Sequence, residues 1–182
     1  MQSKQVNTIT ELQEILDLQK QHLRGVHDQA VEQEQGFVTV VHTLPVLQQM
    51  HRLEPSIIVK DNNMLAGYAL TMAKECRNLV PELQSLFDGL DKITYEGRPI
   101  SMYDFYVMGQ VCVAPAYRGK GVFDLLYEKH KEVFSHKYDF VITDIATRNT
   151  RSLRAHERVG FRTIHTYRDE LDEWAVVVWD WR

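Results

Sequence analysis

The stretch GQVCVAPAYRGKGVFDLLYEKHKE, residues 109–132, contains the junction on which the prediction of the fold depends. An apolar run is followed by two glycines and two cations, and an amphipathic segment begins directly after them. This order predicts a strand that leads into a helix, whose first N–H groups lack partners and lie at the positive end of the helix dipole. Gly119 and Gly121 let the backbone approach a ligand, and Arg118 and Lys120 add charge. We therefore expect the amides from Arg118 through Gly121 to face one hollow and bind a phosphate or pyrophosphate.

Two common phosphate loops do not fit this spacing. A Walker loop requires GxxxxGK[ST], and the dinucleotide fingerprint requires GxGxxG, whereas Asp124 stands in place of the last glycine. A carboxylate at that position would oppose a pyrophosphate. The structural alternative is a plain tight turn with solvated cations.

Length, charge and cysteine content limit the class of protein. The chain has 182 residues, 44% of them hydrophobic, and a formal net charge of −4. These values predict one domain over residues 1–182, with no general attraction for nucleic acid and no membrane span. The two cysteines are too few for a disulfide framework, the first residues have no apolar core of the kind that a signal peptide needs, and no CxxC or HExxH motif occurs. We expect a cytoplasmic protein with reduced thiols and no metal.

Hydrophobic periodicity predicts the elements before the junction. The segment TITELQEILDLQKQHL reads as an amphipathic helix capped by Thr10, and a second helical region and a third helix around Leu47 are expected within residues 26–54. Two strands follow, joined by a hairpin turn at residues 61–63, DNN. Residues 76–99 form a long connection that contains a short helix.

The second half of the chain alternates between strand and helix patterns. The predicted order is strand, helix, strand, helix and a closing hairpin, over residues 100–113, 119–136, 139–146, 150–160, 161–170 and 173–182. This alternation predicts an α/β fold of the α+β type, with helices packed on a mixed sheet.

The segment NTRSLRAHERVGF, residues 149–161, contains a second set of candidate site residues. On a helix, the spacing of three and four residues places Asn149, Ser152 and His156 on one face. Helix capping by Asn149 or Thr150, with Gly160 as the left-handed residue at the end, explains part of this pattern. Capping does not explain all of it.

The two motifs together resemble the GCN5-related N-acetyltransferase (GNAT) family. The family's acetyl-CoA loop reads [RQ]xxGx[GA] after a strand, which RGKGVF matches in its first four places. The later family motif, Asn with a small residue, a Tyr and Gly-Phe at fixed distances, is matched by Asn149, Ser152, Gly160 and Phe161. The resemblance covers residues 101–181 well and residues 1–75 only in element order. It implies a central, mostly antiparallel sheet of six to seven strands, flanked by helices on both faces.

The sequence departs from the family pattern at two positions. Phe123 replaces the Gly or Ala that ends the loop, and we expect its ring to pack in the core beside Val122 and Leu125. His156 stands where many members carry a Tyr.

The resemblance also implies a reaction, in which an amine attacks the thioester of acetyl-CoA directly. It assigns Val111, Cys112 and Val113 to the strand whose N–H groups bind the pantetheine, and one such amide would stabilise the oxyanion. Acetyl-CoA is then the co-substrate. The residues assigned to its binding are Val111, Cys112, Val113, Arg118, Gly119, Lys120, Gly121, Val122, Phe123, Asn149 and Ser152.

His156 is our candidate for the acid that protonates the leaving thiolate, or for a relay to it. With an unperturbed pKa near ~6.5 it is mostly neutral at pH 7 unless its surroundings raise that value. The alternative is a histidine that orders the cleft by hydrogen bonding or packs in it. A buried thiol at Cys112 is expected to pack rather than act as a nucleophile.

Three candidates remain for the base. Asp144 lies five residues before Asn149, where some members carry a catalytic Glu. Asp104 alternates onto one strand face with Tyr106 and Gln110, and water without a dedicated base is the third possibility.

The acceptor and the partners are less defined by the sequence. The family resemblance places the acceptor pocket within residues 22–52 and 76–99. The acidic and histidine side chains of these segments favour a cationic amine of a small molecule or peptide, although solvated surface charges explain them equally well. These side chains are Glu32, Glu34, Asp88, Asp91, His27 and His42. Three arginines are candidates for phosphate contacts or a solvated face: Arg148, Arg151 and Arg154. The tryptophans near the end suit a core or a homodimer contact: Trp174, Trp179 and Trp181. A non-catalytic acyl-CoA-binding sensor or interaction module of the same fold is the alternative function.

Overall fold

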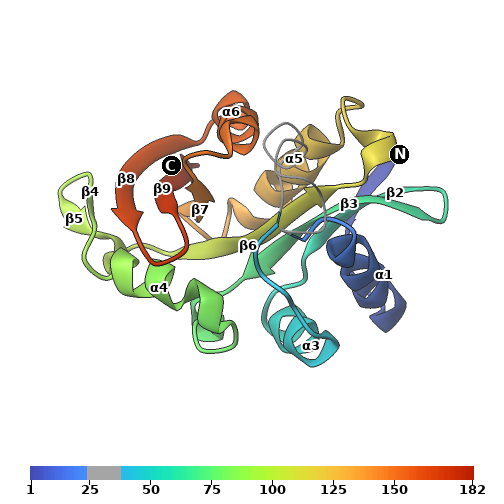
Figure 1. The fold of residues 1–182 in the computed structure, drawn as a ribbon, viewed down its shortest axis with the longest axis horizontal. Coiled ribbons are helices and arrows are strands. Elements are labelled where there is room, and N and C mark those ends of the chain that lie inside the picture. The colour runs from blue at the N-terminus through green and yellow to red at the C-terminus, as the bar shows by residue number, and fades with distance from the viewer. Residues whose placement is uncertain (24–37) are drawn as a thin grey trace.

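A seven-stranded sheet forms the centre of the protein, and helices cover both of its faces (Figure 1). The computed structural model describes residues 1–23 and 38–182. All neighbouring strands are antiparallel except the pair β6 and β7. This confirms the predicted fold class. In sheet order, the strands are β1 (Gln2–Gln5), β2 (Ile57–Asp61), β3 (Met64–Met72), β6 (Phe105–Val113), β7 (Phe140–Ala146), β9 (Glu173–Asp180) and β8 (Arg162–Arg168).

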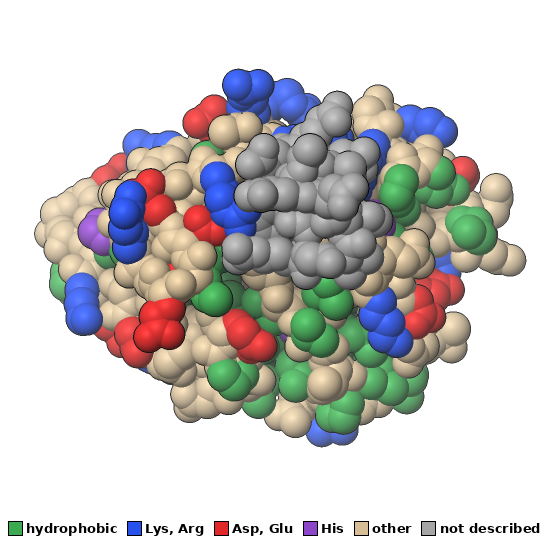
Figure 2. Space-filling view, in the orientation of Figure 1, with side chains coloured by type: hydrophobic (Ala, Val, Ile, Leu, Met, Phe, Trp, Pro, Cys, Tyr) green, Lys and Arg blue, Asp and Glu red, His purple; other side chains and the backbone are tan. Residues whose placement is uncertain are grey.

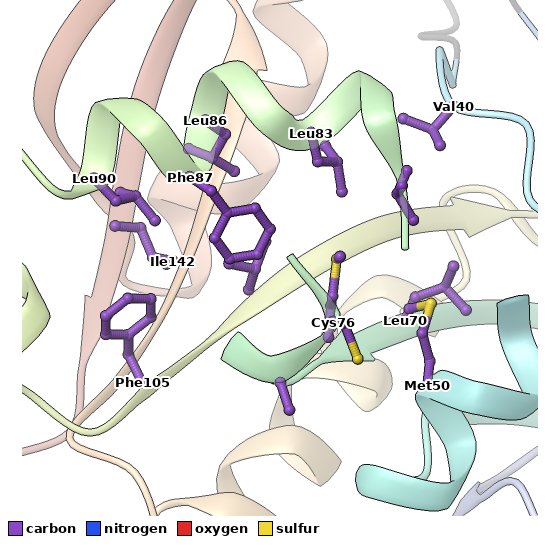
Figure 3. Packing of buried hydrophobic residues seen from close by; sticks show 14 of the residues in the cluster. Val40, Met50, Leu70, Cys76, Leu83, Leu86, Phe87, Leu90, Phe105 and Ile142 are labelled. Atoms are coloured by element: carbon purple, nitrogen blue, oxygen red, sulfur yellow. The ribbon is translucent and has the colours of Figure 1, made fainter. Parts of the chain in front are cut away.

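The helices divide between two apolar clusters, one on each face of the sheet. The first cluster packs the helices α1 (Ile9–Lys20), α3 (Leu44–Leu53) and α4 (Gln84–Leu90). Figure 3 shows part of it, with Leu86, Phe87 and Leu90 of α4 beside Phe105 and Ile142 of the sheet. The second cluster packs the helices α5 (Val122–Phe134) and α6 (Thr150–Val159). Both faces of the central strands are therefore buried, as their continuous apolar runs require.

Short elements fill the connections. Single 3₁₀ turns occur at Lys74–Cys76, Pro81–Leu83, Ile100–Met102 and Pro115–Tyr117, and the strands β4 (Thr94–Tyr95) and β5 (Arg98–Pro99) form a separate small hairpin. The predicted short helix within residues 76–99 is confirmed as α4. Figure 2 shows acidic side chains beside α4 and apolar side chains over α3 on the same face of the molecule.

The first helix begins two residues earlier than Thr10 would require. Thr8 is the N-cap, because its hydroxyl accepts a hydrogen bond from the Glu11 amide at 3.2 Å. The Glu11 carboxylate in turn accepts a hydrogen bond from the Asn7 backbone amide at 2.9 Å. The backbone amides of Asn7 and Glu11, which flank the start of the helix, therefore both have side-chain acceptors. The prediction of Thr10 as the cap is wrong, and Thr10 lies in the first turn.

Other expectations are confirmed in part. The hairpin between β2 and β3 turns at the predicted residues, and Asn62 has a left-handed φ of 52°. The long strand begins at Phe105 rather than at residue 100, since a 3₁₀ turn precedes it. Strand β1 was not predicted. The second helical region lies outside the described residues for most of its length.

A bulge interrupts β6 at Gly109. Leu70 of β3 pairs with Gln110 and Thr71 pairs with Met108, so Gly109 has no opposite residue. The extra residue changes the alternation of side chains. Tyr106 and Met108 pack in the second cluster, which contains α5 and α6, whereas the Gln110 side chain forms hydrogen bonds with Tyr68 and with Gln19 of α1 on the opposite face. The prediction that Gln110 shares a face with Asp104 and Tyr106 is therefore wrong.

Strands β6 and β7 separate at the same place. Their parallel pairing extends only from Phe105 to Val107 on β6, opposite Phe140 to Ile142 on β7. Beyond this point β6 continues with β3 on one side only, and the two strands open into a cleft. This opening positions the candidate site.

Candidate active site

The opening between the strands contains a large and a small cavity. The large cavity, of about 450 Å³, is lined by the end of β6, the loop before α5 and one face of α6. Ten of the eleven residues that the sequence assigned to acetyl-CoA line it, and Lys120 is the exception. Its ammonium group instead lies 5.5 Å from the centre of the Tyr117 ring. A cavity of this volume falls in the usual range for small-molecule sites.

The loop between β6 and α5 has the backbone that its glycines predict. Gly119 and Gly121 have φ values of 72° and 79°, and a Cβ built at either one meets nothing within 4 Å. Conformation therefore requires glycine at both positions, and the space beside them is open. Gly121 is the N-cap of the 13-residue helix α5 and provides no side-chain cap.

Only some amides of the loop are available to a ligand. The amide of Arg118 donates to the Pro115 carbonyl and that of Lys120 to the Tyr117 carbonyl, both at 3.3 Å. The expectation that all amides from Arg118 through Gly121 face the hollow is therefore wrong at these two positions. The first turn of α5 takes their place, because its N–H groups have no acceptor within the helix.

Arginines give the large cavity its charge. Arg118 and Arg151 both line it, and burial together with the nearby Arg151 charge lowers the pKa of Arg118. Two guanidinium groups this close favour an anion between them. Arg158, which no sequence argument singled out, also lines the cavity and binds the Asp124 carboxylate at 2.5 Å. The acidic residue that opposes a pyrophosphate is thus neutralised.

The other arginines of this region have different surroundings. Arg148 forms an ion pair with Asp172 at 2.5 Å, and Arg154 is exposed and lines neither cavity. Of the three arginines proposed from the sequence, Arg151 alone lies in the cavity.

Phe123 packs as predicted. Its ring centre lies 4.7 Å from that of Tyr127 and 5.1 Å from that of His156, while one side of the ring still lines the large cavity. The ring therefore turns toward the interface of α5 and α6 and does not displace the helix start.

His156 is buried, and both of its ring nitrogens have protein partners. Nδ1 lies 2.8 Å from the Ser152 carbonyl, and Nε2 lies 2.6 Å from the Tyr127 hydroxyl. A carbonyl only accepts, so Nδ1 carries the proton and Nε2 accepts from Tyr127. Burial lowers the pKa of His156 to about 4, and the ring is neutral at pH 7. This arrangement agrees with the alternative role, a histidine that orders the cleft, rather than with an acid for the thiolate.

Asp144 lines the small cavity, at the place where β7 has separated from β6. Its carboxylate accepts a hydrogen bond from the Tyr167 hydroxyl at 2.5 Å. Burial raises the pKa of Asp144 to about 6, against the opposing effect of that hydrogen bond. A carboxylate of this basicity, partly accessible from the cavity, is suited to accept a proton.

Asp104 lies away from both cavities. It is exposed just before β6, where its amide donates to the Asp139 carboxylate at 3.0 Å. Seven residues of extended chain separate it from Val111, a span of roughly 23 Å. The structure does not support Asp104 as the base.

The small cavity adjoins the large one and has an acidic lining. The two cavities share Val38, Val111, Asn149 and Ser152. Asp144, Asp169 and Glu82 contribute carboxylates to the small cavity, and the Asp169 charge contributes to the raised pKa of Asp144. Two binding spaces that meet at the β6 bulge allow two substrates to react where they touch.

The acceptor residues expected from the sequence are only partly in place. The connection 76–99 provides Glu82 and Leu83 to the small cavity, whereas Asp88 and Asp91 form surface ion pairs with Arg77. His42 is buried behind the cavity, and the remaining three candidates lie outside the described residues: His27, Glu32 and Glu34.

Other candidates have structural roles. Burial raises the pKa of Cys112 to about 12, which favours packing over nucleophilic attack. Trp179 and Trp181 pack in the α5 cluster, and Trp174 lines the small cavity. Among residues 1–23 and 38–182, no three His, Cys, Asp or Glu side chains form a group that could hold a metal, and none of the helices there could cross a membrane.

Comparison with known proteins gives a family and a fold. The model of the acetyltransferase (GNAT) family matches residues 12–161. None of the curated proteins matches the sequence. Among solved structures, the ribosomal-protein-S18-alanine N-acetyltransferase from Escherichia coli aligns with a TM-score of 0.65 at 11% identity, over 98% of this chain and 92% of its own.

Two further structures resemble the chain to a similar degree. A chimera of the spermidine N-acetyltransferase SpeG from Vibrio cholerae and hSSAT has a TM-score of 0.61 at 13% identity, over 99% and 95% of the two chains. The protein yncA from Salmonella typhimurium, solved with its cofactor acetyl-CoA, has a TM-score of 0.63 at 15% identity, over 100% and 94%. At such identities these similarities show the fold alone.

Proposed function

Because the chain belongs to the acetyltransferase (GNAT) family, we propose that it transfers the acetyl group of acetyl-CoA to a primary amine of a small molecule or peptide by direct attack. One observation carries this proposal. A cavity with glycine amides, a helix N-terminus and two arginines meets an acidic cavity at a bulge in the central strand.

The residues of the large cavity fit acetyl-CoA. The amides of Gly119 and Gly121, the first turn of α5 and the guanidinium groups of Arg118 and Arg151 suit the diphosphate. The edge of β6 beyond Val107 is not paired with β7, so its amides can bind the pantetheine as a neighbouring strand would. In this proposal, an amide near Val111 stabilises the developing oxyanion.

The small cavity suits the amine. A primary ammonium ion of the lysine type has a pKa near ~10.4, so the acidic lining attracts its charged form. The ammonium ion first loses one proton to solvent, because only the neutral amine has a lone pair that can attack the thioester carbon. Asp144 accepts the second proton as the C–N bond forms and the C–S bond breaks. The leaving thiolate takes up one proton, which balances the proton that Asp144 accepts. Neutral His156 also lines the small cavity, and its bond to Tyr127 ties α6 to α5 beside Asn149 and Ser152, which both cavities share.

The alternative is an acyl-CoA-binding module without catalysis. The observation that favours it is His156, which stands at the place of the family's Tyr and has no proton free to give to the sulfur. We propose the cytoplasm as the compartment, because Cys76 and Cys112 are both free thiols.

Calorimetric titration with acetyl-CoA, combined with release of free coenzyme A thiol across a panel of amines, tests the proposal. Two structural neighbours are named for spermidine and for an alanine of a ribosomal protein, so the panel includes spermidine, butane-1,4-diamine and an alanine-initiated peptide. Amine-dependent thiol release supports acetyl transfer. Binding without thiol release for any amine favours the module, and no binding of acetyl-CoA refutes both.

A further inference from the structure

Gln110, the residue after the bulge, is the centre of a buried amide network. Its side-chain oxygen accepts from the Tyr68 hydroxyl at 2.5 Å and from the Gln19 amide at 2.8 Å. Its side-chain nitrogen donates to the Val40 carbonyl at 2.9 Å. These three hydrogen bonds of the Gln110 side chain connect the bulge to β3, to α1 and to the segment before α3.

Gln19 extends this network to the same segment. Its side-chain oxygen accepts from the His42 backbone amide at 2.9 Å, and its nitrogen donates to Nδ1 of His42, also at 2.9 Å. Burial lowers the pKa of His42 to about 4, so the ring is neutral and Nδ1 is able to accept. Gln19 and Gln110 are only 1% and 8% exposed, and Gln110 also lines the small cavity.

The segment held in this way, residues 38–42, borders the proposed acceptor site. Val38, Thr39 and Val40 line the small cavity, and Val38 also lines the large one. The segment contains no helix or strand, and beyond the bridge of Val38 with Leu23 no sheet ladder fixes its backbone. Its position over the bulge is therefore set by the packing of Val38 and Val40 in the first apolar cluster and by bonds to the two glutamine side chains.

We propose that Gln110 and Gln19 are positioning residues that hold residues 38–42 as one side of the acceptor cavity. The proposal builds on the acetyl transfer proposed above and adds the device that fixes the acceptor. The distance between the acceptor amine and the bulge, where the thioester would lie, depends on both sides of the cavity. The bulge contributes one side, and Gln110 ties the opposite side to it.

The test compares Gln110→Met with Tyr68→Phe. Methionine has a similar shape and removes the bonds of Gln110 to Val40, Gln19 and Tyr68, whereas Tyr68→Phe removes only the bond between Tyr68 and Gln110 and keeps those to Val40 and Gln19. Tyr68→Phe therefore controls for the loss of a bond in the same buried network that does not hold the segment. Hydrogen–deuterium exchange of the backbone amides of residues 38–43 is measured in both variants and in the unaltered protein, together with steady-state kinetics for butane-1,4-diamine and calorimetry for acetyl-CoA.

We expect exchange in residues 38–43 to become at least about tenfold faster in Gln110→Met and to stay within about twofold in Tyr68→Phe. The KM for the diamine should rise about tenfold in the first variant only, while the Kd for acetyl-CoA changes less than about twofold in both. Unchanged exchange in Gln110→Met, or equal changes in the two variants, overturns the proposal. If the unaltered protein binds acetyl-CoA but acetylates no amine, the acetyl transfer fails, and exchange alone then decides whether Gln110 holds the segment.

Discussion

Replacement of Asp144 by Asn is expected to lower activity and raise stability at neutral pH. The carboxyl group has a pKa of about 6 in the folded protein against an ordinary value of 3.8. Because the folded state binds this proton more tightly than the unfolded state, Asp144 favours folding below pH 4, and that contribution is lost as the pH rises to 6. The pKa difference corresponds to about 3 kcal/mol, an upper value because the side chain is partly accessible. The amide of the Asp144→Asn variant does not ionise and is free of that cost.

Activity should change in the opposite direction. Loss of a general base typically reduces turnover by about 10²-fold or more, and kcat/KM should lose the limb that rises through pH 6. Thermal unfolding at pH 4 and pH 7.5 measures the stability, and thiol release against pH measures the rate. Asp104→Asn is the matched control, because Asp104 is exposed outside both cavities. The reasoning is refuted if Asp144→Asn keeps full turnover with the same pH limb, or if its stability relative to the unaltered protein is equal at both pH values.

Three further changes test the remaining parts of the site. Arg151→Ala should weaken acetyl-CoA binding about tenfold in calorimetry, whereas Arg154→Ala on the exposed part of the same helix should leave the Kd unchanged; equal effects would place the phosphates elsewhere. His156→Phe leaves the Tyr127 hydroxyl without its acceptor and should cost about 1–3 kcal/mol of stability, with turnover of the folded protein reduced less than about tenfold; a loss of about 10²-fold would restore His156 as the acid. Glu82→Gln should raise the KM for butane-1,4-diamine, which carries two ammonium groups, about threefold at low salt. The KM for the monoamine butylamine should stay nearer its original value. Asp88→Asn should change neither KM, because Asp88 is already paired with Arg77 on the surface.

Local chemistry explains which parts of the site the sequence predicts. The glycines of the loop and the asparagine turn of the hairpin are required by the backbone at their own positions, so their residue types show the structure directly. The spacing of Asn149, Ser152 and His156 on α6 is equally local. Helix capping belongs to this class only in part, because Thr8 with Glu11 and Thr10 with Gln13 both match the T-x-x-[EQ] capping pattern, and the structure is needed to identify Thr8 as the cap.

The errors come from features that depend on distant parts of the chain. The single residue Gly109 inverts the alternation of β6, and an isolated glycine within a strand is the sequence signal for such a bulge. Asp104 has the right residue type, but only the strand length shows that it lies far from the cavities. Arg158 follows Arg151 by two helical turns and so shares its face, a spacing that the sequence does contain. Glu82 and Tyr127 enter the site through packing between elements, which no local pattern records.

The two departures from the family pattern lie against each other in space. Phe123 and His156 are 33 positions apart in the sequence, yet their rings meet edge to face at 5.1 Å, and Tyr127 contacts both. The tyrosine that many family members carry at this position of α6 is absent here, and the Tyr127 hydroxyl on α5 donates to Nε2 of His156. The same burial that makes His156 neutral raises the pKa of Asp144, because each group loses the stabilisation of its charged form. In the proposed reaction, the His156 ring and the Asp144 carboxyl both line the small cavity, and Asp144, which has the higher pKa, is the group suited to accept a proton.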